Sequence, residues 1–169
     1  MSKDKHTAEI INRKVRYEYS TIQSFEAGVV LKGTEVKSLR KGNAQMVDAF
    51  CVFEHGELYL RNLHIAEYEL GTVYNHEPKR TRKLLLKKAE LKKINKRVTE
   101  KGMTVVPYRI YFSDRGFVKI EILLAQGKKS YDKRNSIKDR DVKRDLARMK
   151  KELGYLVIVY WIQNRRHWL

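Results

Sequence analysis

The side chains best suited to chemistry are scattered along this sequence of 169 residues. The five histidines, at positions 6, 55, 64, 76 and 167, form neither an HxH nor an HExxH pattern of the kind that binds metal. The single cysteine, Cys51, stands between Phe50 and Val52 in a run typical of a strand, and we interpret it as a buried structural thiol. The sequence therefore predicts no metal site and no cofactor.

The acidic residues also lack the spacing of a catalytic centre. Glu26, Glu35 and Asp48 lie far apart in the sequence, and nothing in their spacing requires a carboxylate pair. Capping or hydrogen bonding is the simpler role for each of them. The sequence has neither a GxSxG pattern nor a phosphate-binding loop pattern. We therefore predict that the protein is not an enzyme.

The excess of basic residues is the strongest indication of a partner. The chain has 37 Lys and Arg residues against 20 Asp and Glu residues, which gives a formal net charge of +17. A charge of this size repels itself in the folded state and is usually kept because a polyanion neutralises it. Nucleic acid and an anionic membrane surface are the two candidate partners.

Three features of the sequence favour nucleic acid and a cytoplasmic location. The N-terminal stretch MSKDKHTAEI lacks the apolar segment of a signal peptide. The longest apolar run, LVIVYWI at 156–162, is far shorter than the roughly 20 residues that span a bilayer. A single cysteine forms no internal disulfide, which suits a reducing compartment. We therefore predict a cytoplasmic protein with no membrane partner.

Most of the chain up to residue 126 has the patterns of antiparallel strands. The run at 17–31 is rich in aromatic and β-branched residues and predicts a long first strand. Two hairpins are predicted, one at 49–65 around EHGE and one at 103–125 around SDRG. In the second hairpin, Pro107 predicts an edge strand or a bulge. Its last strand is expected to place four aliphatic residues on one face: Val118, Ile120, Ile122 and Leu124.

A short helix and a barrel complete this part of the prediction. TEVKSLR at 34–40 predicts a helix with Thr34 as its cap. About five strands joined by short turns, with two helices, are typical of a small antiparallel barrel. The predicted fold class is therefore mainly β with short helices: an OB-fold-like antiparallel β-barrel plus a basic C-terminal tail that is helical or disordered.

The second predicted helix is unusually basic. It covers KRTRKLLLKKAELKKINKR at 79–97, in which Leu84, Leu91 and Ile94 share one face. This segment has ten Lys and Arg residues against one acid, Glu90. The acids that normally relieve repulsion between lysines one turn apart are missing, so polyanion binding is favoured over a merely solvated face.

The chain after residue 126 changes character. From Gly127 to Glu152 it has eleven basic and five acidic residues, and almost no aliphatic residue before position 142. One stripe of a helix follows, formed by Val142, Leu146, Met149 and Leu153. We interpret the segment as an amphipathic basic helix outside the barrel.

Four motifs, in this order, resemble those of a known family. They are NRKVRYEY from Asn12, FEAGVVLKGTEVKSLRKG from Phe25, NHEPKRTRKLLL from Asn75 and GKKSYDKR from Gly127. Together they closely resemble the small protein B (SmpB) family, the bacterial partners of transfer-messenger RNA (tmRNA). The resemblance runs from about position 10 to about position 150. Motifs of this length are specific.

The resemblance implies an oligonucleotide-binding barrel without catalytic chemistry. The implied partner is the tRNA-like domain of tmRNA, which the protein delivers to ribosomes stalled without a stop codon. Elongation factor Tu takes part indirectly, through the tmRNA. The protein is implied to replace a missing anticodon arm, while its tail enters the empty mRNA channel near the decoding centre and meets ribosomal RNA.

The resemblance also implies two sets of site residues. The set implied for tmRNA binding is Asn12, Arg13, Lys14, Tyr19, Glu26, Lys37, Arg40, Arg80, Arg82, Lys83 and Leu85. The set implied for the ribosome-contacting tail is Gly127, Lys128, Lys129, Tyr131, Asp132, Lys133, Arg134, Lys138 and Arg140. Basic side chains of this kind neutralise phosphates, and an Asn can bond a sugar or a base edge. We interpret Glu26 as orienting a base or a neighbouring Arg, and Leu85 as a packing residue.

Four parts of the chain are expected. They are a disordered arm at 1–9, an OB-like RNA-binding barrel at 10–126, a basic tail at 127–152 that is helical on the ribosome, and an apolar extension at 153–169. That extension departs from the short basic end expected of the family. Tyr131 is a second departure, since some relatives have His there.

Three other functions remain open at this point. A general nucleic-acid chaperone would bind single strands by charge and stacking, with little preference for folded tRNA-like RNA. A membrane-surface protein would depend on the apolar residues after position 155. An enzyme would have to turn over RNA in a metal-dependent way.

Overall fold

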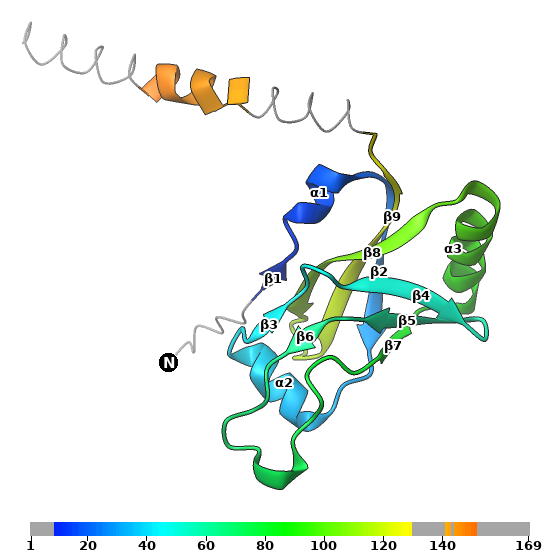
Figure 1. Cartoon of the computed structure of the whole chain (residues 1–169), viewed down its shortest axis with the longest axis vertical. Coiled ribbons are helices and arrows are strands. Elements are labelled where there is room, and N and C mark those ends of the chain that lie inside the picture. Colours follow the sequence, from blue (N-terminus) through cyan, green and yellow to red (C-terminus); the bar gives the residue numbers. More distant parts are fainter. Residues whose placement is uncertain (1–8, 130–140, 143, 152–169) are drawn as a thin grey trace, which may run out of the picture. The chain divides into compact units, whose positions relative to one another are not determined.

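The computed structural model describes residues 9–129, 141–142 and 144–151 (Figure 1). Its strands are β1 (Ile10–Ile11), β2 (Tyr19–Val29), β3 (Ala44–Gln45), β4 (Phe50–Glu54), β5 (Glu57–Arg61), β6 (His64–Ile65), β7 (Arg82–Leu85), β8 (Thr104–Phe112) and β9 (Val118–Gly127). Its labelled helices are α1 (Lys14–Glu18), α2 (Gly33–Arg40), α3 (Lys88–Lys101) and the 3-10 helix η1 (Thr72–Tyr74).

The strands of the larger sheet close into a ring. Their order is β1-β8-β4-β5-β7-β2-β9, and β9 also pairs with β8, which closes the circle. All of these pairings are antiparallel. The predicted fold class, a mainly β antiparallel barrel with short helices, is confirmed. The shorter strands β3 and β6 form a separate pair.

The core fills the inside of this ring. The four aliphatic residues predicted to share a face of the last strand are all buried: Val118, Ile120, Ile122 and Leu124. Leu58 and Leu60 of β5 are fully buried in the same cluster. Alternation along each strand sends one face inward, which leaves the intervening side chains for the surface.

Both predicted hairpins are present, because their turn residues suit the backbone. His55 and Gly56 have φ values of 50° and 77°, as the tight turn between β4 and β5 requires. Gly116, with φ of 81°, lies in the turn between β8 and β9. The register between these two strands shifts between Pro107 and Arg109, so the bulge expected at the proline is also confirmed.

The basic helix predicted at 79–97 is wrong in its first half. Arg82–Leu85 forms β7, which pairs with β5 and β2, and α3 begins only at Lys88. Leu84 is buried in β7 and does not share a helical face with Ile94. The physical reason is alternation: Arg82 and Leu84 point inward and Lys83 and Leu85 point outward, which a strand allows and a helix does not.

Three smaller expectations also differ from the structure. The first strand does not start at residue 17, because α1 takes up residues 14–18 before β2 begins. Thr34 is not the cap of α2; its hydroxyl lies 2.9 Å from Nδ1 of His76. The part of the chain described here has nine strands rather than about five.

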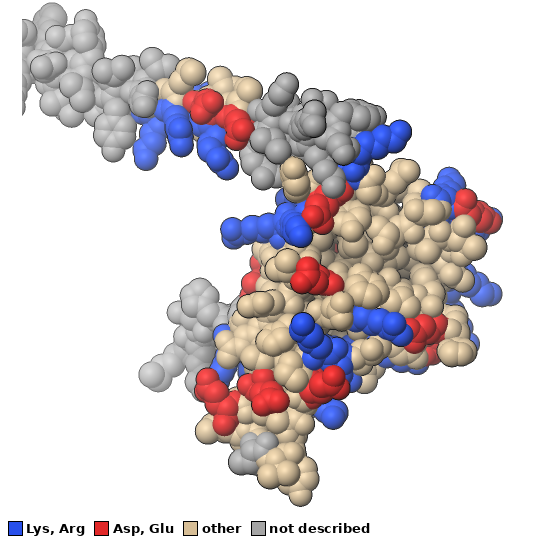
Figure 2. Space-filling view, in the orientation of Figure 1, with Lys and Arg blue, Asp and Glu red and all other residues tan. Residues whose placement is uncertain are grey.

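The chain divides into two compact units, Met1–Lys128 and Lys129–Leu169. In the second unit, residues 141–142 and 144–151 are helical, and Val142, Leu146 and Met149 are more than half exposed. Figure 2 shows basic side chains on one side of this helix and uncharged ones on the other. Residues 1–8 of the predicted disordered arm, Leu153 and the apolar extension lie outside the described residues, and the predicted domain limits stay a prediction. Glu9, the last residue of the predicted arm, is described, and its Oε1 accepts a hydrogen bond from Nη1 of Arg109 at 2.9 Å.

Crossing a membrane takes a long apolar helix, and the described residues contain none.

Candidate nucleic-acid interface

The candidate interface is organised around a buried carboxylate, Glu35 of α2. Its Oε1 accepts hydrogen bonds from Nε of Arg80 and from Nε of Arg82, both at 2.8 Å. Its Oε2 accepts a hydrogen bond from the Lys32 amide at 2.6 Å and another from Nη2 of Arg80. The side chains of Glu35 and Arg82 are both 0% exposed. These bonds fix α2 to β7 and to the loop before it.

Arg82 is held inside the protein by carbonyl oxygens as well. Its guanidinium donates to the backbone oxygens of Leu63 at 2.6 Å, Arg80 at 2.9 Å and Pro78 at 3.0 Å. The prediction that Arg82 contacts RNA directly therefore does not fit its position. Arg82 supports the surface from beneath.

The Glu35 carboxyl is ionised in this setting. Burial alone would raise its pKa, but the hydrogen bonds from Arg80 and the Lys32 amide, with the charge of Arg82, outweigh burial and lower the pKa. One carboxylate thus faces two guanidinium groups. Arg80 is the more accessible of the two, with a side chain 22% exposed.

The outer side of α2 presents cations that rest on aromatic rings. The Nζ atoms of Lys37 and Lys41 lie 5.1 and 5.3 Å from the centroid of the Tyr68 ring. The guanidinium carbon of Arg40 lies 5.9 Å from the centroid of the Phe112 ring. Rings of this kind hold a cation in place without neutralising it. The charges of Lys37 and Arg40 remain available to a phosphate.

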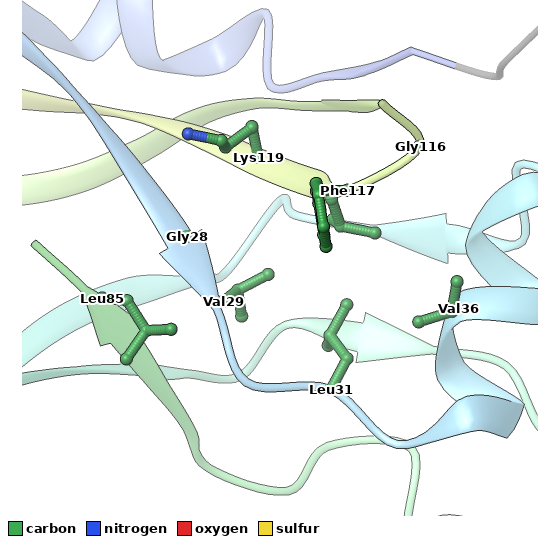
Figure 3. Close-up of a pocket in the computed structure, with 9 residues that line it drawn as sticks. Gly28, Val29, Leu31, Val36, Leu85, Gly116, Phe117 and Lys119 are labelled. Carbon is green, nitrogen blue, oxygen red and sulfur yellow. The ribbon is translucent and has the colours of Figure 1, made fainter. Parts of the chain in front are cut away.

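An open apolar groove lies beside α2, between the end of β2, β7 and the hairpin of β8 and β9 (Figure 3). It is lined by Gly28, Val29, Leu31, Val36, Leu85, Gly116, Phe117, Val118 and Lys119. Leu85 and Phe117 are 52% and 66% exposed, so the groove presents an apolar surface to solvent. Leu85 pairs with Gly28 across the strands, and the missing side chain at Gly28 leaves the leucine uncovered.

Glu26 lines a pocket that adjoins this groove and shares Gly28, Leu85 and Lys119 with it. Its Oε1 accepts a hydrogen bond from Nζ of Lys119 at 2.8 Å, and its Oε2 accepts one from the Tyr111 hydroxyl. The bond from Lys119, followed by that from Tyr111, lowers the pKa of the Glu26 carboxyl. Burial first, and then the bond to Glu26, raise the pKa of Tyr111 to about 12. The side chains bonded to Glu26 are thus a lysine and a tyrosine rather than the predicted arginine, and the alternative, that Glu26 orients a base, stays a prediction.

A second group of predicted residues lies around α1. Asn12 is buried and its Nδ2 donates to the backbone oxygen of Met46 at 2.9 Å, so it holds α1 in place and does not face solvent. Arg13 and Lys14 are exposed. The Nζ atom of Lys14 lies 3.4 Å from Oε1 of Glu18, with which it forms an ion pair. Tyr19 is half-buried and packs against a small core cluster that is separate from the main core.

The remaining predicted residues are Lys83 and those from Gly127 onward; some of them bond to other parts of the protein and others are exposed. The backbone amide of Lys128 donates to the Glu18 oxygen at 2.9 Å, and its Nζ donates to the Arg16 oxygen at 3.1 Å. Gly127 ends β9, and Lys129 is exposed. Lys83 pairs with Glu57, which raises the pKa of Lys83. The other predicted tail residues lie outside the described residues: Tyr131, Asp132, Lys133, Arg134, Lys138 and Arg140.

The structure therefore does not gather the predicted residues into one patch. It brings Glu26 and Leu85 to one groove and Lys37, Arg40 and Arg80 to α2 beside it. Sequence reasoning missed Lys119 and Phe117. Alternation could have found Lys119, since it lies between two inward residues of the last strand.

A metal site does not emerge from the geometry. Within residues 9–129, 141–142 and 144–151, no three His, Cys, Asp or Glu side chains are grouped so that they could hold an ion. Cys51 is half-buried in β4, and burial raises the pKa of its thiol.

Comparison with known proteins gives the family. The family model described as SmpB protein matches residues 9–152. The chain belongs to the SmpB family. Among curated SmpB relatives, the SsrA-binding protein of Desulforamulus reducens is 54% identical over 141 residues, covering 83% of this chain and 88% of the relative. The SsrA-binding protein of Flavobacterium psychrophilum is 50% identical over 146 residues, covering 86% of this chain and 97% of the relative.

A solved SmpB structure is also similar. It comes from work described as "tmRNA-SmpB: a journey to the center of the bacterial ribosome". The TM-score is 0.61 at 50% sequence identity, and the match covers 72% of this chain and 85% of that chain. The predicted resemblance to the SmpB family is confirmed.

Removing the charge of Glu35 should destabilise the barrel strongly. Glu35→Gln leaves two guanidinium groups without their carboxylate, so we expect the free energy of unfolding to fall by about 3–5 kcal/mol. Folding lowers the pKa of Glu35 below its ordinary 4.5, so its contribution is complete above that pH and is lost as the pH falls below it. The variant should therefore lose less stability on acidification than the unchanged protein does. Urea unfolding at several pH values measures both effects.

Glu69→Gln is the matched control, because it removes an exposed carboxylate that pairs with Lys41. We expect little change in stability from it. Equal losses from the two variants would show that Glu35 is no more important than a surface acid.

Proposed function

We propose that this chain binds the tRNA-like domain of tmRNA and delivers it to stalled ribosomes for trans-translation. It acts as a binding protein without catalysis of its own, in the cytoplasm where ribosomes are. Elongation factor Tu is a partner only through the tmRNA. The observation that carries this proposal is about half sequence identity to SsrA-binding proteins, SsrA being tmRNA, along nearly their whole length.

The face around α2 has the chemistry that a folded RNA requires. Lys37 and Arg40 offer positive charge to phosphates, and Arg80 stands behind them at the rim of the Glu35 cluster. The apolar groove accepts an unpaired base on the ring of Phe117, beside Leu85, as aromatic side chains do in single-stranded RNA recognition. Glu26 accepts a hydrogen bond from a base or a ribose hydroxyl, while Lys119 keeps its carboxylate in place.

The residues around α1 and the root of the tail have a different role in this proposal. Arg13 and Lys14 extend the basic surface, and Asn12 and Tyr19 set the position of α1. Lys128 fixes the end of β9 at α1. From Lys129 onward the chain enters the mRNA channel and contacts ribosomal RNA near the decoding centre. The tail residues carried over from the family act there.

A competition experiment separates this function from general nucleic-acid binding. Labelled tRNA-like domain of tmRNA is titrated with the protein at two salt concentrations, with an excess of bulk tRNA or of single-stranded RNA of equal length. We expect binding to survive both competitors, because the protein recognises the folded shape. Binding that either competitor abolishes, and that collapses with salt, would identify a charge-driven nucleic-acid chaperone instead.

Arg40→Gln should weaken binding of the tRNA-like domain by about 1.5 kcal/mol or more, because it removes a charged phosphate contact. The dependence of log K on log salt should become shallower by about 0.7–0.9 for that lost contact. Arg61→Gln is the control, since Arg61 is also exposed but pairs with Glu54 on another strand. An unchanged salt slope for Arg40→Gln would remove Arg40 from the interface.

Truncation after Lys129 should separate capture of tmRNA from action on the ribosome. The shortened protein keeps the bonds of Lys128 to α1. We therefore expect its melting temperature and its affinity for the tRNA-like domain to equal those of the full chain. Peptide tagging on stalled ribosomes should stop, because the tail is missing. Tagging at the normal rate would refute this division of labour between barrel and tail.

A further inference from the structure

An exposed apolar tip lies at the end of the loop between β6 and β7. Leu70 is 76% exposed, Val73 93% and Tyr74 89%, the three largest values for bulky apolar side chains among the described residues. Figure 1 shows this loop reaching beyond α2. Exposed apolar side chains that stand together commonly mark an interaction site. We refer to Leu70, Val73 and Tyr74 as the η1 tip.

The loop holds the η1 tip in a fixed turn. Oδ1 of Asn75 accepts hydrogen bonds from the amides of Tyr68 and His76, both at 3.1 Å, and its Nδ2 donates to the Tyr68 oxygen at 2.9 Å. The Gly71 amide donates to the same oxygen at 2.7 Å. The ring of His76 is buried, with Nδ1 2.9 Å from the Thr34 hydroxyl. A surface fixed in this way loses less conformational freedom when it binds a partner.

The charge around the η1 tip has the opposite sign to that of the whole chain. The stretch 62–78 contains no Lys or Arg but contains Glu67, Glu69 and Glu77. All three glutamates are exposed. Figure 2 shows acidic side chains gathered near the uncharged end of this loop. Glu69 pairs with Lys41, so Glu67 and Glu77 give the loop its negative charge.

This combination does not suit a phosphate-bearing partner. Carboxylates repel the backbone of RNA, and residues 62–78 provide no cation to bind a phosphate. The surface of an anionic membrane is negative as well, so the same carboxylates oppose lipid binding. A protein with a basic surface and an apolar recess fits both properties of the loop. Aromatic side chains that fill such recesses dominate many protein interfaces, and opposite charges around them guide the encounter.

We propose that the η1 tip docks on a basic protein surface, and that on the stalled ribosome this partner is a ribosomal protein rather than RNA. Proteins that bind RNA carry an excess of Lys and Arg, so the ribosome offers surfaces of this kind. Tyr74 fills an apolar recess of the partner, while Glu67 and Glu77 face its basic side chains. The inference rests on the proposed function, which brings this chain to the ribosome.

The first test places a photoreactive side chain at the η1 tip. Tyr74→p-benzoylphenylalanine keeps an aromatic group there, and Phe117→p-benzoylphenylalanine, in the groove proposed to bind RNA, is the matched control. Each full chain is irradiated together with tmRNA on ribosomes stalled without a stop codon. We expect position 74 to join a basic ribosomal protein and position 117 to join tmRNA. If position 74 joins RNA, elongation factor Tu or a second copy of this chain, or joins nothing, the inference is wrong.

The second test uses the sign of the charge. Glu67→Gln with Glu77→Gln removes two exposed carboxylates and nearly keeps their shape. We expect the yield of the protein adduct at position 74 to fall about two- to fivefold, because attraction to a basic surface is lost. A higher yield would indicate a partner that bears phosphate and would contradict the inference. Glu100→Gln, which removes an exposed carboxylate from α3, is the control and should leave the yield unchanged.

The third test measures what the η1 tip contributes to binding. Val73→Ser with Tyr74→Ser should weaken binding of the protein and tmRNA to stalled ribosomes about tenfold, as loss of an apolar anchor does. The melting temperature and the affinity for the tRNA-like domain should not change, because both side chains are almost fully exposed.

Ile22→Ser is the control for this variant, because it removes an apolar side chain of β2 that is 44% exposed. It should leave ribosome binding unchanged. Equal losses from the two variants, no loss from the tip variant, or weaker binding of the tRNA-like domain by the tip variant would each refute the inference. The proposed function fails separately, if bulk tRNA displaces the unchanged protein from the tRNA-like domain.

Discussion

The carboxylate of Glu35 is the interaction on which the rest of this surface depends. A fully buried guanidinium such as that of Arg82 is costly unless an opposite charge and hydrogen bonds compensate for it. Glu35 supplies the charge and also accepts the Lys32 amide at the start of α2. Because α2 has only eight residues, tertiary contacts of this kind, more than its own helix propensity, set its orientation. The outward direction of Lys37 and Arg40 therefore follows from a bond made beneath them.

The acids of the barrel are largely used within the protein, and this shapes the charge that a partner meets. Glu26, Glu57 and Glu69 each pair with a lysine, and the pKa of each carboxyl is lowered by a hydrogen bond from that lysine. In α2, Lys37 rests on the ring of Tyr68 and Arg40 on the ring of Phe112 instead. A ring positions a cation but leaves its charge in place. Positive charge is thus retained where a polyanion is proposed to bind.

Local patterns predicted much of the fold, and long-range pairing decided the rest. The turns at His55-Gly56 and Gly116 and the inward face of β9 are properties of neighbouring residues, so they are visible in the sequence. The helix predicted at 79–97 was wrong in its first half, because leucines at helical spacing run across the boundary between β7 and α3. Only the pairing of β7 with β5 and β2 shows that its first half is extended. The sequence contains no sign of which partners those residues meet.

The site was harder to predict than the fold, because the role of a charged residue depends on where its partner lies. Arg80, Arg82 and Lys83 look alike in the sequence, yet Arg80 bonds Glu35 with a side chain 22% exposed, Arg82 is fully buried on Glu35, and Lys83 pairs with Glu57. Lys128 gives the same lesson, since a residue of a basic tail motif proves to hold the end of β9 on α1. That contact has a consequence for function. Lys128 ends the first compact unit at a fixed point, so the part of the chain proposed to enter the ribosome starts at a position set by the fold that is proposed to bind the RNA.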